Sequence, residues 1–598
     1  MALSEKHWVC SLDTSKKETV CYVIAKKHLP GIAVAFLFIF YLYYQVQVQQ
    51  YYGLFQKGDT FFHVSRVYEI RYAFLYHELP NWLNYHSYFG LGQAVNGMYP
   101  DLMLWPLVLV TLPLPLMKQI IAIRVVILAL TCLVTYLSLV KRKYQSNLAI
   151  FAAVIYTLSG YSLYQATTEI QLGTGIIYIF SFPLFFALVD LFKRKKIDRY
   201  LVLRLGLLFT IIVSSHLLSA VILAFIVALI LLYHWLIDRD FNWAVLANLA
   251  LSGITSAVLS MPVLYRYFYL SRSGLAKPYE QGMITADTVQ KMVSDIDWST
   301  RTTFSAISLV LLAICLFFGK KSEKMVKLLL LELMLALLCT NFFPWNLIDK
   351  IPMLNNFQYT PWRFGIWLSI IPIILYLTTF ANPLKVSSKL PFKFLLLLAL
   401  MTPLISGQAI KSLNEDPVKR ICITQSFMDS SQGNVETVND EFHNYLLIRD
   451  YAPIESSVKD GSNRVTKLTS NLAFHPFIAN SKKQQAKVWR EPVNNGFKIH
   501  VQADLKGRSF RLPLYKYRTV RYSVKVNGQE VEAQKDKQGY MQVATKQSLH
   551  KGDVITVNSY NPATYPVIVV ISLLLFVGCC AVLWCHEGKV KNRLDLKI

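Results

Sequence analysis

The sequence predicts an α-helical polytopic membrane protein of about 12 transmembrane helices, with a β-rich domain outside the membrane before the last helix. Only 16% of the 598 residues are charged, whereas soluble proteins average about 25%, and the mean hydropathy is +0.37. Apolar runs of about 16–22 residues, which approach the length needed to cross a bilayer, recur along most of the chain. These runs lie at 31–49, 117–140, 148–165, 173–191, 199–215, 218–237, 243–264, 303–319, 326–342, 363–380, 390–407 and 566–585.

Basic residues predict which side of the membrane each loop faces. Lysine and arginine clusters at 141–143, 193–196 and 320–327 fall in every second loop, and such loops stay on the cytoplasmic side. We therefore expect the tails 1–30 and 586–598 to be cytoplasmic and the chain to lie in the plasma membrane. Much of the net charge of +25 lies in these loops, so we expect no nucleic-acid partner.

If both tails and the basic loops are cytoplasmic, one apolar segment must not cross the membrane. Segment 102–116 is short and interrupted by prolines, so we expect a re-entrant or interfacial helix there. The bundle would span 31–407 and the last helix 566–585. The pieces outside the cytoplasm would be a first loop at 50–101, loops at 265–302 and 343–362, and a domain at 408–565.

The segment 408–565 has a different character from the rest. Its apolar runs give way to alternating apolar and polar residues, and an Asn-Gly pair at 527–528 is typical of a hairpin turn. We expect an antiparallel β-sandwich there. The segment has 23 Lys and Arg against 15 Asp and Glu, about +8, which suits an anionic envelope polymer or lipid headgroups as partner. An ordinary solvated surface is an equal alternative.

The first loop contains the best candidates for chemistry. Asp59, His63 and Arg66 are spaced four and three residues apart, so a helix would place them on one face. A carboxylate, an imidazole and a guanidinium fit acid–base catalysis and phosphate binding, although amphipathic helices often contain such triples. Apolar residues up to Pro80 predict a helix lying on the membrane surface.

Two further polar residues lie at the ends of apolar runs. His216 follows Ser214 and Ser215, where a plain interhelical hydrogen bond is the alternative to a functional role. Arg363 opens the run at 363–380, where an arginine reaching toward the membrane boundary is the alternative. On the predicted topology, both residues lie on the same outer side as Asp59.

Several motifs resemble a known group of enzymes. GDTFFHVSR, SSHLLSA and QYTPWRF, with YFGLGQ and MYPDLMLWP between them, are similar to the bacterial YfhO-type proteins, often labelled "6-pyruvoyl-tetrahydropterin synthase related". The arrangement of long first loop, helical bundle and terminal exported β domain resembles the GT-C superfamily of membrane glycosyltransferases. NYLLIRDYAPIES is similar to the segment where the exported domain of that branch begins.

The resemblance implies inverting transfer of a sugar from a polyprenyl-phosphate carrier to an extracytoplasmic acceptor, such as teichoic acid, lipoteichoic acid or an envelope polysaccharide. Asp59 occupies the position of the catalytic acidic residue and would deprotonate the acceptor hydroxyl. Arg363, with Arg66, would hold the lipid phosphate, and His63 and His216 would orient the donor. The pterin-related label has no support, because the sequence has no His-rich zinc set.

The chain departs from the family pattern at one point. Several members have paired acidic residues in this loop, whereas Asp59 is followed by Thr60, and the nearest further acids are Glu69 and Glu78. This departure speaks against a divalent metal, although the donor phosphate could supply ligands. The sequence also lacks a Walker loop, a dinucleotide fingerprint and a zinc spacing, so it shows no sign of an ATP-driven motor. The donor we expect is the polyprenyl-phosphate-linked sugar.

Two other functions compete with the transferase. A transporter or flippase of a lipid-linked envelope precursor would place polar residues near the bilayer midplane and often contains inverted repeats, and no clear repeat is present. A scaffold whose exported domain binds wall polymer would need far fewer helices. Candidate charges at one membrane boundary therefore favour the enzyme.

Overall fold

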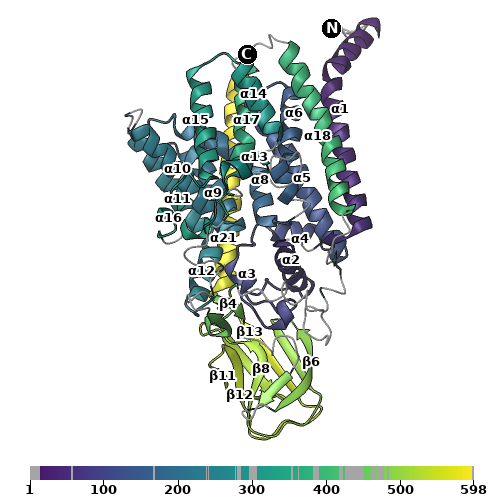
Figure 1. Cartoon of the computed structure of the whole chain (residues 1–598), viewed down its shortest axis with the longest axis vertical. Helices are drawn as coiled ribbons and strands as arrows, with labels where there is room; N and C mark the ends of the chain where they lie inside the picture. Colours follow the sequence, from purple (N-terminus) through teal and green to yellow (C-terminus); the bar gives the residue numbers. More distant parts are fainter. Residues whose placement is uncertain are drawn as a thin grey trace, which may run out of the picture.

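The computed structural model is mostly helical (64%) and joins a bundle of apolar helices to a β half-barrel (Figure 1). The residues described are 14–55, 58–165, 169–236, 239, 242–276, 278, 284–294, 306–351, 354–357, 359–360, 363–380, 389–415, 422–424, 428, 450–459, 465–468, 477–480, 484–493 and 495–595.

Each predicted apolar run contains a helix, because uninterrupted apolar sequence favours the one structure that satisfies its own backbone hydrogen bonds. The helices that cover these runs are α1 (Thr14–Tyr52), α5 (Leu116–Lys141), α6 (Ser146–Thr157), α7 (Gly160–Leu163), α8 (Leu172–Leu191), α9 (Arg199–Ser215), α10 (Leu217–Leu236), α11 (Trp243–Leu259), α12 (Met261–Ser271), α14 (Ala306–Phe318), α15 (Glu323–Leu338), α17 (Gly365–Phe380), α18 (Lys389–Glu415) and α21 (Thr564–Asp595).

Six of the described helices are long and apolar enough to cross a membrane. They are His28–Tyr52, Leu116–Lys141, Leu172–Leu191, Leu217–Leu236, Pro391–Lys411 and Thr564–Lys589. A seventh span is present if α11 and α12, which meet at a bend of 72°, count as one. The remaining helices are shorter: α6 has 12 residues and α14 has 13, which is roughly 18–20 Å against a core of about 30 Å.

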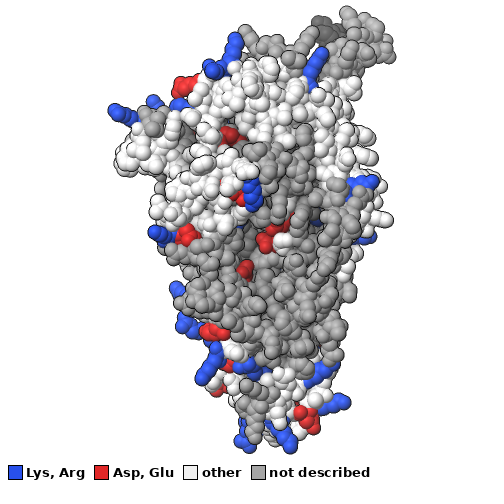
Figure 2. Space-filling model, in the orientation of Figure 1, with Lys and Arg blue, Asp and Glu red and all other residues white. Residues whose placement is uncertain are grey.

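Both ends of the described chain lie at the end of the bundle away from the half-barrel (Figure 1). The basic loops predicted to share one side lie at that end, and Figure 2 shows basic side chains there. Ion pairs link the last helix, α21, to α5 and α9 at this end. Glu587 of α21 lies 2.5 Å from Nζ of Lys141 and 3.1 Å from Nη2 of Arg204.

Nine strands of the C-terminal region form one curved antiparallel sheet, in the order β10-β9-β13-β7-β6-β5-β8-β12-β11, and β3 (Ser457–Lys459) and β4 (Val465–Leu468) form a separate antiparallel pair. The strands of the sheet are β5 (Phe477–Asn480), β6 (Gln485–Val493), β7 (Gly496–Val501), β8 (Ser509–Tyr515), β9 (Arg521–Val526), β10 (Gln529–Glu530), β11 (Ala533–Lys535), β12 (Tyr540–Ala544) and β13 (Val554–Tyr560). Asn527 and Gly528 have φ values of 49° and 83° between β9 and β10, which confirms the predicted turn.

The predicted sandwich of two sheets is wrong, because one long strand makes the sheet continuous. The first half of β6 pairs with β5 through 485–487. Its second half pairs with β7 through 488–493. A strand of nine residues that changes partner along its length joins the two halves into a half-barrel.

The first loop and the segment 102–116 that follows it form a layer between the bundle and the half-barrel. The loop contains α2 (Thr60–Leu75) and α3 (Val95–Met98), and the segment contains α4 (Trp105–Thr111). The prediction that α2 lies on the membrane surface is wrong: Phe61, Val67 and Ile70 are buried inside the protein. Their apolar face packs into a core that also includes half-barrel residues such as Phe497. α4 has seven residues, about 10 Å, too short to cross a bilayer.

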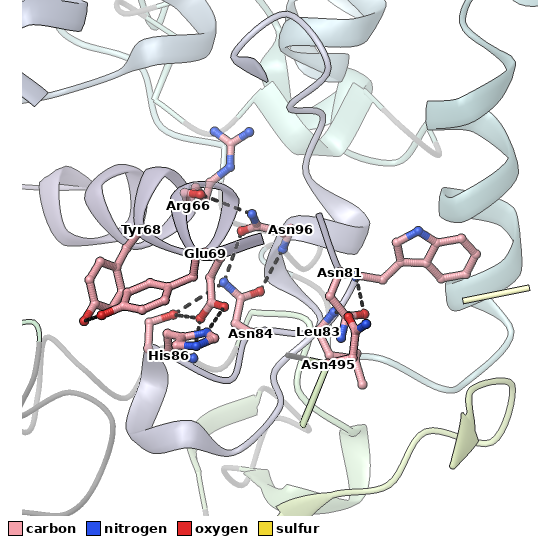
Figure 3. A network of polar contacts seen from close by, with 12 residues as sticks. Arg66, Tyr68, Glu69, Asn81, Leu83, Asn84, His86, Asn96 and Asn495 are labelled. Atoms are coloured by element: carbon pink, nitrogen blue, oxygen red, sulfur yellow. Dashed lines mark hydrogen bonds and ion pairs between the residues drawn. The ribbon is translucent and has the colours of Figure 1, made fainter. Parts of the chain in front are cut away.

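A buried polar network fixes the shape of this loop layer (Figure 3). One Glu69 carboxylate oxygen accepts hydrogen bonds from the His86 backbone N–H at 2.8 Å and the Ser87 hydroxyl at 2.7 Å. The other lies 3.2 Å from Nδ1 of His86. Asn84 and Asn96 hydrogen-bond each other at 3.1 and 3.0 Å. Both carboxylate oxygens of Glu69 therefore contact residues of the loop and stabilise its conformation.

The half-barrel docks on the loop layer through hydrogen bonds as well as shared apolar core. The Tyr515 backbone N–H donates to the Leu91 carbonyl at 2.8 Å, and the Ala94 N–H donates to the Tyr517 hydroxyl at 3.1 Å. Asn495 donates to the Glu78 carboxylate at 2.7 Å. Strand β1 (Leu54–Phe55) of the first loop also pairs with β2 (Cys422–Ile423), which lies between α18 and the half-barrel in the sequence.

A buried ion pair ties the end of the loop layer to the bundle. Nη2 of Arg266 on α12 lies 2.5 Å from Oδ1 of Asp101, and both side chains are almost fully buried, at 1% and 0% exposure. The same Nη2 lies 3.3 Å from the Tyr99 carbonyl oxygen. Because neither charge has access to water, each depends on the other for its stability in the folded protein.

We predict that Asp101→Asn lowers the free energy of unfolding by about 3–5 kcal/mol, because it leaves the Arg266 charge buried without its partner. Thermal unfolding of the purified protein in detergent measures the change. Glu323→Gln is the matched control, since its pair with Lys327 is on the surface, and should change the stability by less than about 1 kcal/mol. Equal effects of the two changes would contradict the importance of the buried pair.

Candidate functional site

Seven side chains from distant parts of the sequence gather where the bundle meets the loop layer. We call this set the Tyr99 cluster. Its members are Asp59, His63, Arg66, Tyr99, Glu169, His216 and Arg363. All five residues singled out from the sequence belong to it, and Tyr99 and Glu169 are additions from the structure.

Helix α2 presents three of these residues on one face, as their spacing predicts. Asp59 is the N-cap residue, and its carbonyl accepts the His63 backbone N–H at 3.0 Å. Its carboxylate makes no capping bond to the helix. Nη1 of Arg66 lies 3.3 Å from Nδ1 of His63. The side chain of Asp59 is thus left for other partners.

Tyr99 lies at the centre of the cluster. Its ring centroid is 5.8 Å from that of His63 and 5.5 Å from that of His216, and the Arg66 guanidinium carbon lies 4.3 Å from the ring centroid. Arg66 also donates from Nη2 to the Pro100 carbonyl. Such stacking of a cation on an aromatic face favours the planar guanidinium. Arg66 thereby fixes the position of Tyr99.

Arg363 and His216 complete the cluster from the far part of the bundle. The charge of Arg363 acts on Asp59, Tyr99 and His216. Its Nε donates to the Phe357 carbonyl at 2.8 Å, which orients the guanidinium. His216 lies between α9 and α10, and its Nδ1 is 2.7 Å from the Ser219 hydroxyl. Ser219 lies in the first turn of α10, three residues from His216, so this bond is local and does not join two distant helices.

Glu169 supplies a second carboxylate beside Asp59. Its Oε1 accepts the Asp59 backbone N–H at 3.3 Å, and its Oε2 accepts the Tyr164 hydroxyl at 2.8 Å. A side chain at position 58 would clash, because a Cβ on Gly58 would lie 2.1 Å from Glu169 Oε1. Gly58 also has a φ of +49°, which glycine adopts most readily. The approach of the two acids therefore depends on this glycine.

Sequence reasoning missed Glu169, although a signal was present. The acids nearest to Asp59 in the sequence after it are Glu69 and Glu78, but their carboxylates contact His86 and Asn495 in the structure. Glu169 lies between the apolar runs 148–165 and 173–191, in a turn that the predicted topology places on the same side as Asp59. The shared predicted membrane side of Asp59 and this turn is therefore the sequence signal that points to Glu169.

The environment of Asp59 favours its protonated form more than water does. Asp59 keeps an exposed surface, yet protein atoms crowd its other sides. This desolvation and then the negative charge of Glu169 raise the pKa of Asp59 to about 6, against an opposing effect of Arg363. A carboxylate with such a pKa is a stronger base than an ordinary one and is still ionised at neutral pH.

The imidazole of His63 is held neutral. Burial, followed by the nearby charges of Arg66 and His216, lowers the pKa of His63 well below its usual value. A neutral ring accepts the Arg66 N–H at Nδ1 and keeps its own proton on Nε2. His63 is therefore suited to donate a hydrogen bond rather than to carry charge.

The cluster combines accessible and buried parts. Asp59 is exposed and Tyr99 and Arg363 are half-buried, whereas His63, Arg66 and Glu169 have at most 3% exposure. A ligand can reach the base and the Arg363 cation directly. The buried members fix the geometry from behind. Such an arrangement can take a proton at Asp59 and hold an anion at Arg363.

The Tyr99 cluster supplies only some of the ligands that a divalent cation needs. The described part of the chain contains no group of three or more His, Cys, Asp or Glu side chains arranged to hold a metal. Asp59 and Glu169 could supply two carboxylates, and Mg²⁺ often completes its shell with waters and substrate phosphate. The protein residues alone therefore do not make a metal site.

Neither protein-family models nor curated protein sequences show a match to this chain.

The pKa of Asp59 has a consequence for stability. The folded pKa of about 6 lies above the ordinary value of 3.8, so the stabilising effect of the protonated acid is present below pH 3.8 and is lost as the pH rises through 6. Asn resembles the protonated acid. We predict that Asp59→Asn raises the melting temperature at pH 7.5 and that the difference disappears toward pH 4. A lower melting temperature for Asp59→Asn at pH 7.5 would contradict this environment.

Proposed function

We propose that this protein is an inverting membrane glycosyltransferase of the GT-C type, in the YfhO-type branch. It would move a sugar from a polyprenyl-phosphate carrier to an extracytoplasmic acceptor. The observation that carries the proposal is an exposed carboxylate of raised pKa, Asp59, beside an accessible cation, Arg363. A base and an anion-binding group are the two parts that this transfer requires.

The transfer follows from these two groups. Asp59 takes the proton of the acceptor hydroxyl as its oxygen attacks the anomeric carbon. The new glycosidic bond forms while the bond from that carbon to the phosphate oxygen breaks, with its electron pair leaving on the phosphate. Arg363 stabilises the charge on the departing phosphate. Attack from the face opposite the phosphate inverts the configuration at the anomeric carbon.

The buried members have supporting roles in this proposal. Arg66 was predicted to bind the lipid phosphate, but at 1% exposure it is better placed to position Tyr99. His63 and His216 were predicted to orient the donor; neutral His63, also at 1% exposure, would do so through the Tyr99 ring that it contacts, as would His216. Glu169 would keep Asp59 basic. A divalent metal is not required, because Arg363 already supplies positive charge at the leaving group.

The topology of the proposal follows the positive-inside pattern. The basic end of the bundle and both tails would be cytoplasmic, and the Tyr99 cluster and half-barrel would face outward from the plasma membrane. The shorter helices would complete the predicted bundle of about 12 spans together with their neighbours. The basic half-barrel would attract an anionic acceptor such as a teichoic acid or lipoteichoic acid.

A lipid flippase remains the competing function, and one observation disfavours it. The cluster that would handle the phosphate lies at one end of the bundle, next to the half-barrel. A transporter would hold its substrate near the midplane, between its two openings. The enzyme needs its reacting groups only where donor and acceptor meet.

The transfer assay tests the proposal directly. Purified wild type is presented with radiolabelled polyprenyl-phosphate sugars and crude envelope polymer. We predict that Asp59→Asn lowers the rate at least about a hundredfold, as loss of a general base does. Asp504→Asn, an exposed acid on the half-barrel, is the control and should keep the wild-type rate. Full activity in a folded Asp59→Asn protein would remove Asp59 from the mechanism. Movement of lipid between leaflets without transfer would favour the flippase.

Glu169 gives a second prediction, on the pH dependence. The rate should fall as the pH drops through about 6, where Asp59 becomes protonated. Glu169→Gln removes a negative charge that raises the pKa of Asp59 but keeps an oxygen to accept the Asp59 N–H. We predict that the acidic limb of the pH–rate profile moves to lower pH. Glu78→Gln, which changes an acid bonded to Asn495, should leave the profile unmoved. An unmoved limb in Glu169→Gln would contradict the coupling.

A further inference from the structure

A groove of about 430 Å³ lies between α1 and α18, away from the Tyr99 cluster. It is lined by Leu37, Phe40, Tyr41, Tyr44, Pro403, Leu404, Gly407, Gln408 and Lys411. No member of the Tyr99 cluster is among these residues, and the proposed reaction does not use them.

Two residues of α18 create the concave surface. Pro403 is inside the helix, where its ring removes a backbone hydrogen bond and bends the axis. Gly407, one turn further, has no side chain, and a Cβ there would lie 3.5 Å from the Tyr44 ring. The space that larger side chains would fill is therefore left open along this face.

The lining changes from apolar to basic along the groove. Both walls belong to candidate membrane spans, His28–Tyr52 and Pro391–Lys411, so the groove lies at the depth of the lipid chains. Lys411 is the last residue of its span, and its side chain is exposed. α1 and α18 leave the bundle at the same end, because the strands that follow them, β1 and β2, pair. Lys411 thus lies at headgroup depth on the half-barrel side.

Three buried polar side chains of α1 make no hydrogen bond within the described structure, and the charge of Arg124 acts on one of them, Tyr41. The groups are the Tyr41 hydroxyl and the side-chain amides of Gln45 and Gln49. The three residues are spaced four apart, so they form one stripe on α1. Tyr41 also lines the groove. Gln45 and Gln49 do not line the groove, so the Tyr41 hydroxyl is the group that a bound molecule would reach with a hydrogen bond.

We propose that this groove is a binding site for an anionic phospholipid. One acyl chain lies along Leu37, Phe40 and Leu404, and the phosphate lies against Lys411 and Gln408. Apolar surface in contact with the chain supplies affinity, and the cation at headgroup depth supplies the preference for negative charge. The inference is independent of the glycosyltransferase proposal, because it rests on other residues.

Native mass spectrometry of the full-length protein tests this inference. The protein is purified in detergent and incubated with phosphatidylglycerol or with phosphatidylcholine of the same chains. We expect one phosphatidylglycerol to be retained by the wild type, with a preference over phosphatidylcholine that Lys411→Gln reduces about fivefold. Gly407→Leu should abolish retention by filling the groove. Gly253→Leu on α11 is the matched control, because a Cβ there meets nothing within 4 Å, and it should retain the lipid.

Thermal unfolding establishes that each variant is folded, and Leu37→Trp fills the groove from α1 if Gly407→Leu is unstable. Retention of phosphatidylglycerol by a folded groove-filling variant would overturn the site. An unchanged preference in Lys411→Gln would overturn the placement of the headgroup. Displacement of phosphatidylglycerol by a lower concentration of polyprenyl phosphate would overturn phospholipid as the occupant.

Discussion

Two buried arginines hold the short segment Tyr99–Asp101, and the candidate site depends on that restraint. Arg266 pairs with Asp101 and contacts the Tyr99 carbonyl, while Arg66 donates to the Pro100 carbonyl and stacks on the Tyr99 ring. Burying two guanidinium groups is costly unless each finds fixed partners. The segment therefore has one favoured position, and the rings of His63 and His216 pack around it.

The restraint extends from the site to the rest of the molecule. Arg266 belongs to α12 and Arg66 to α2, so the same segment joins the bundle to the loop layer. The loop layer in turn shares an apolar core with the half-barrel. A half-barrel that lacks an independent core cannot move freely over the site. The acceptor would therefore approach a preorganised surface, which is what a base and an anion-binding group need in order to act together.

The sequence predicted what depends on local pattern and missed what depends on contacts between distant segments. Apolar runs located the helices, and alternation with Asn527–Gly528 located several strands. The sandwich was wrong, because the change of partner along β6 is a property of the whole sheet. Asp59, His63 and Arg66 were found by helical spacing. Glu169 was not found, because it is 110 residues away from Asp59 in the sequence. Helical spacing also gives no information on the burial of Arg66, which depends on the segments packed around it.

A structure of the full-length protein with a non-transferable polyprenyl-phosphate sugar analogue tests the central claim most directly. The account predicts that the phosphate lies within hydrogen-bonding distance of the Arg363 guanidinium. The anomeric carbon should then face the Asp59 carboxylate with room for one acceptor hydroxyl between them. A phosphate bound away from Arg363, or a sugar directed away from Asp59, would contradict the assignment of the Tyr99 cluster as a transferase site.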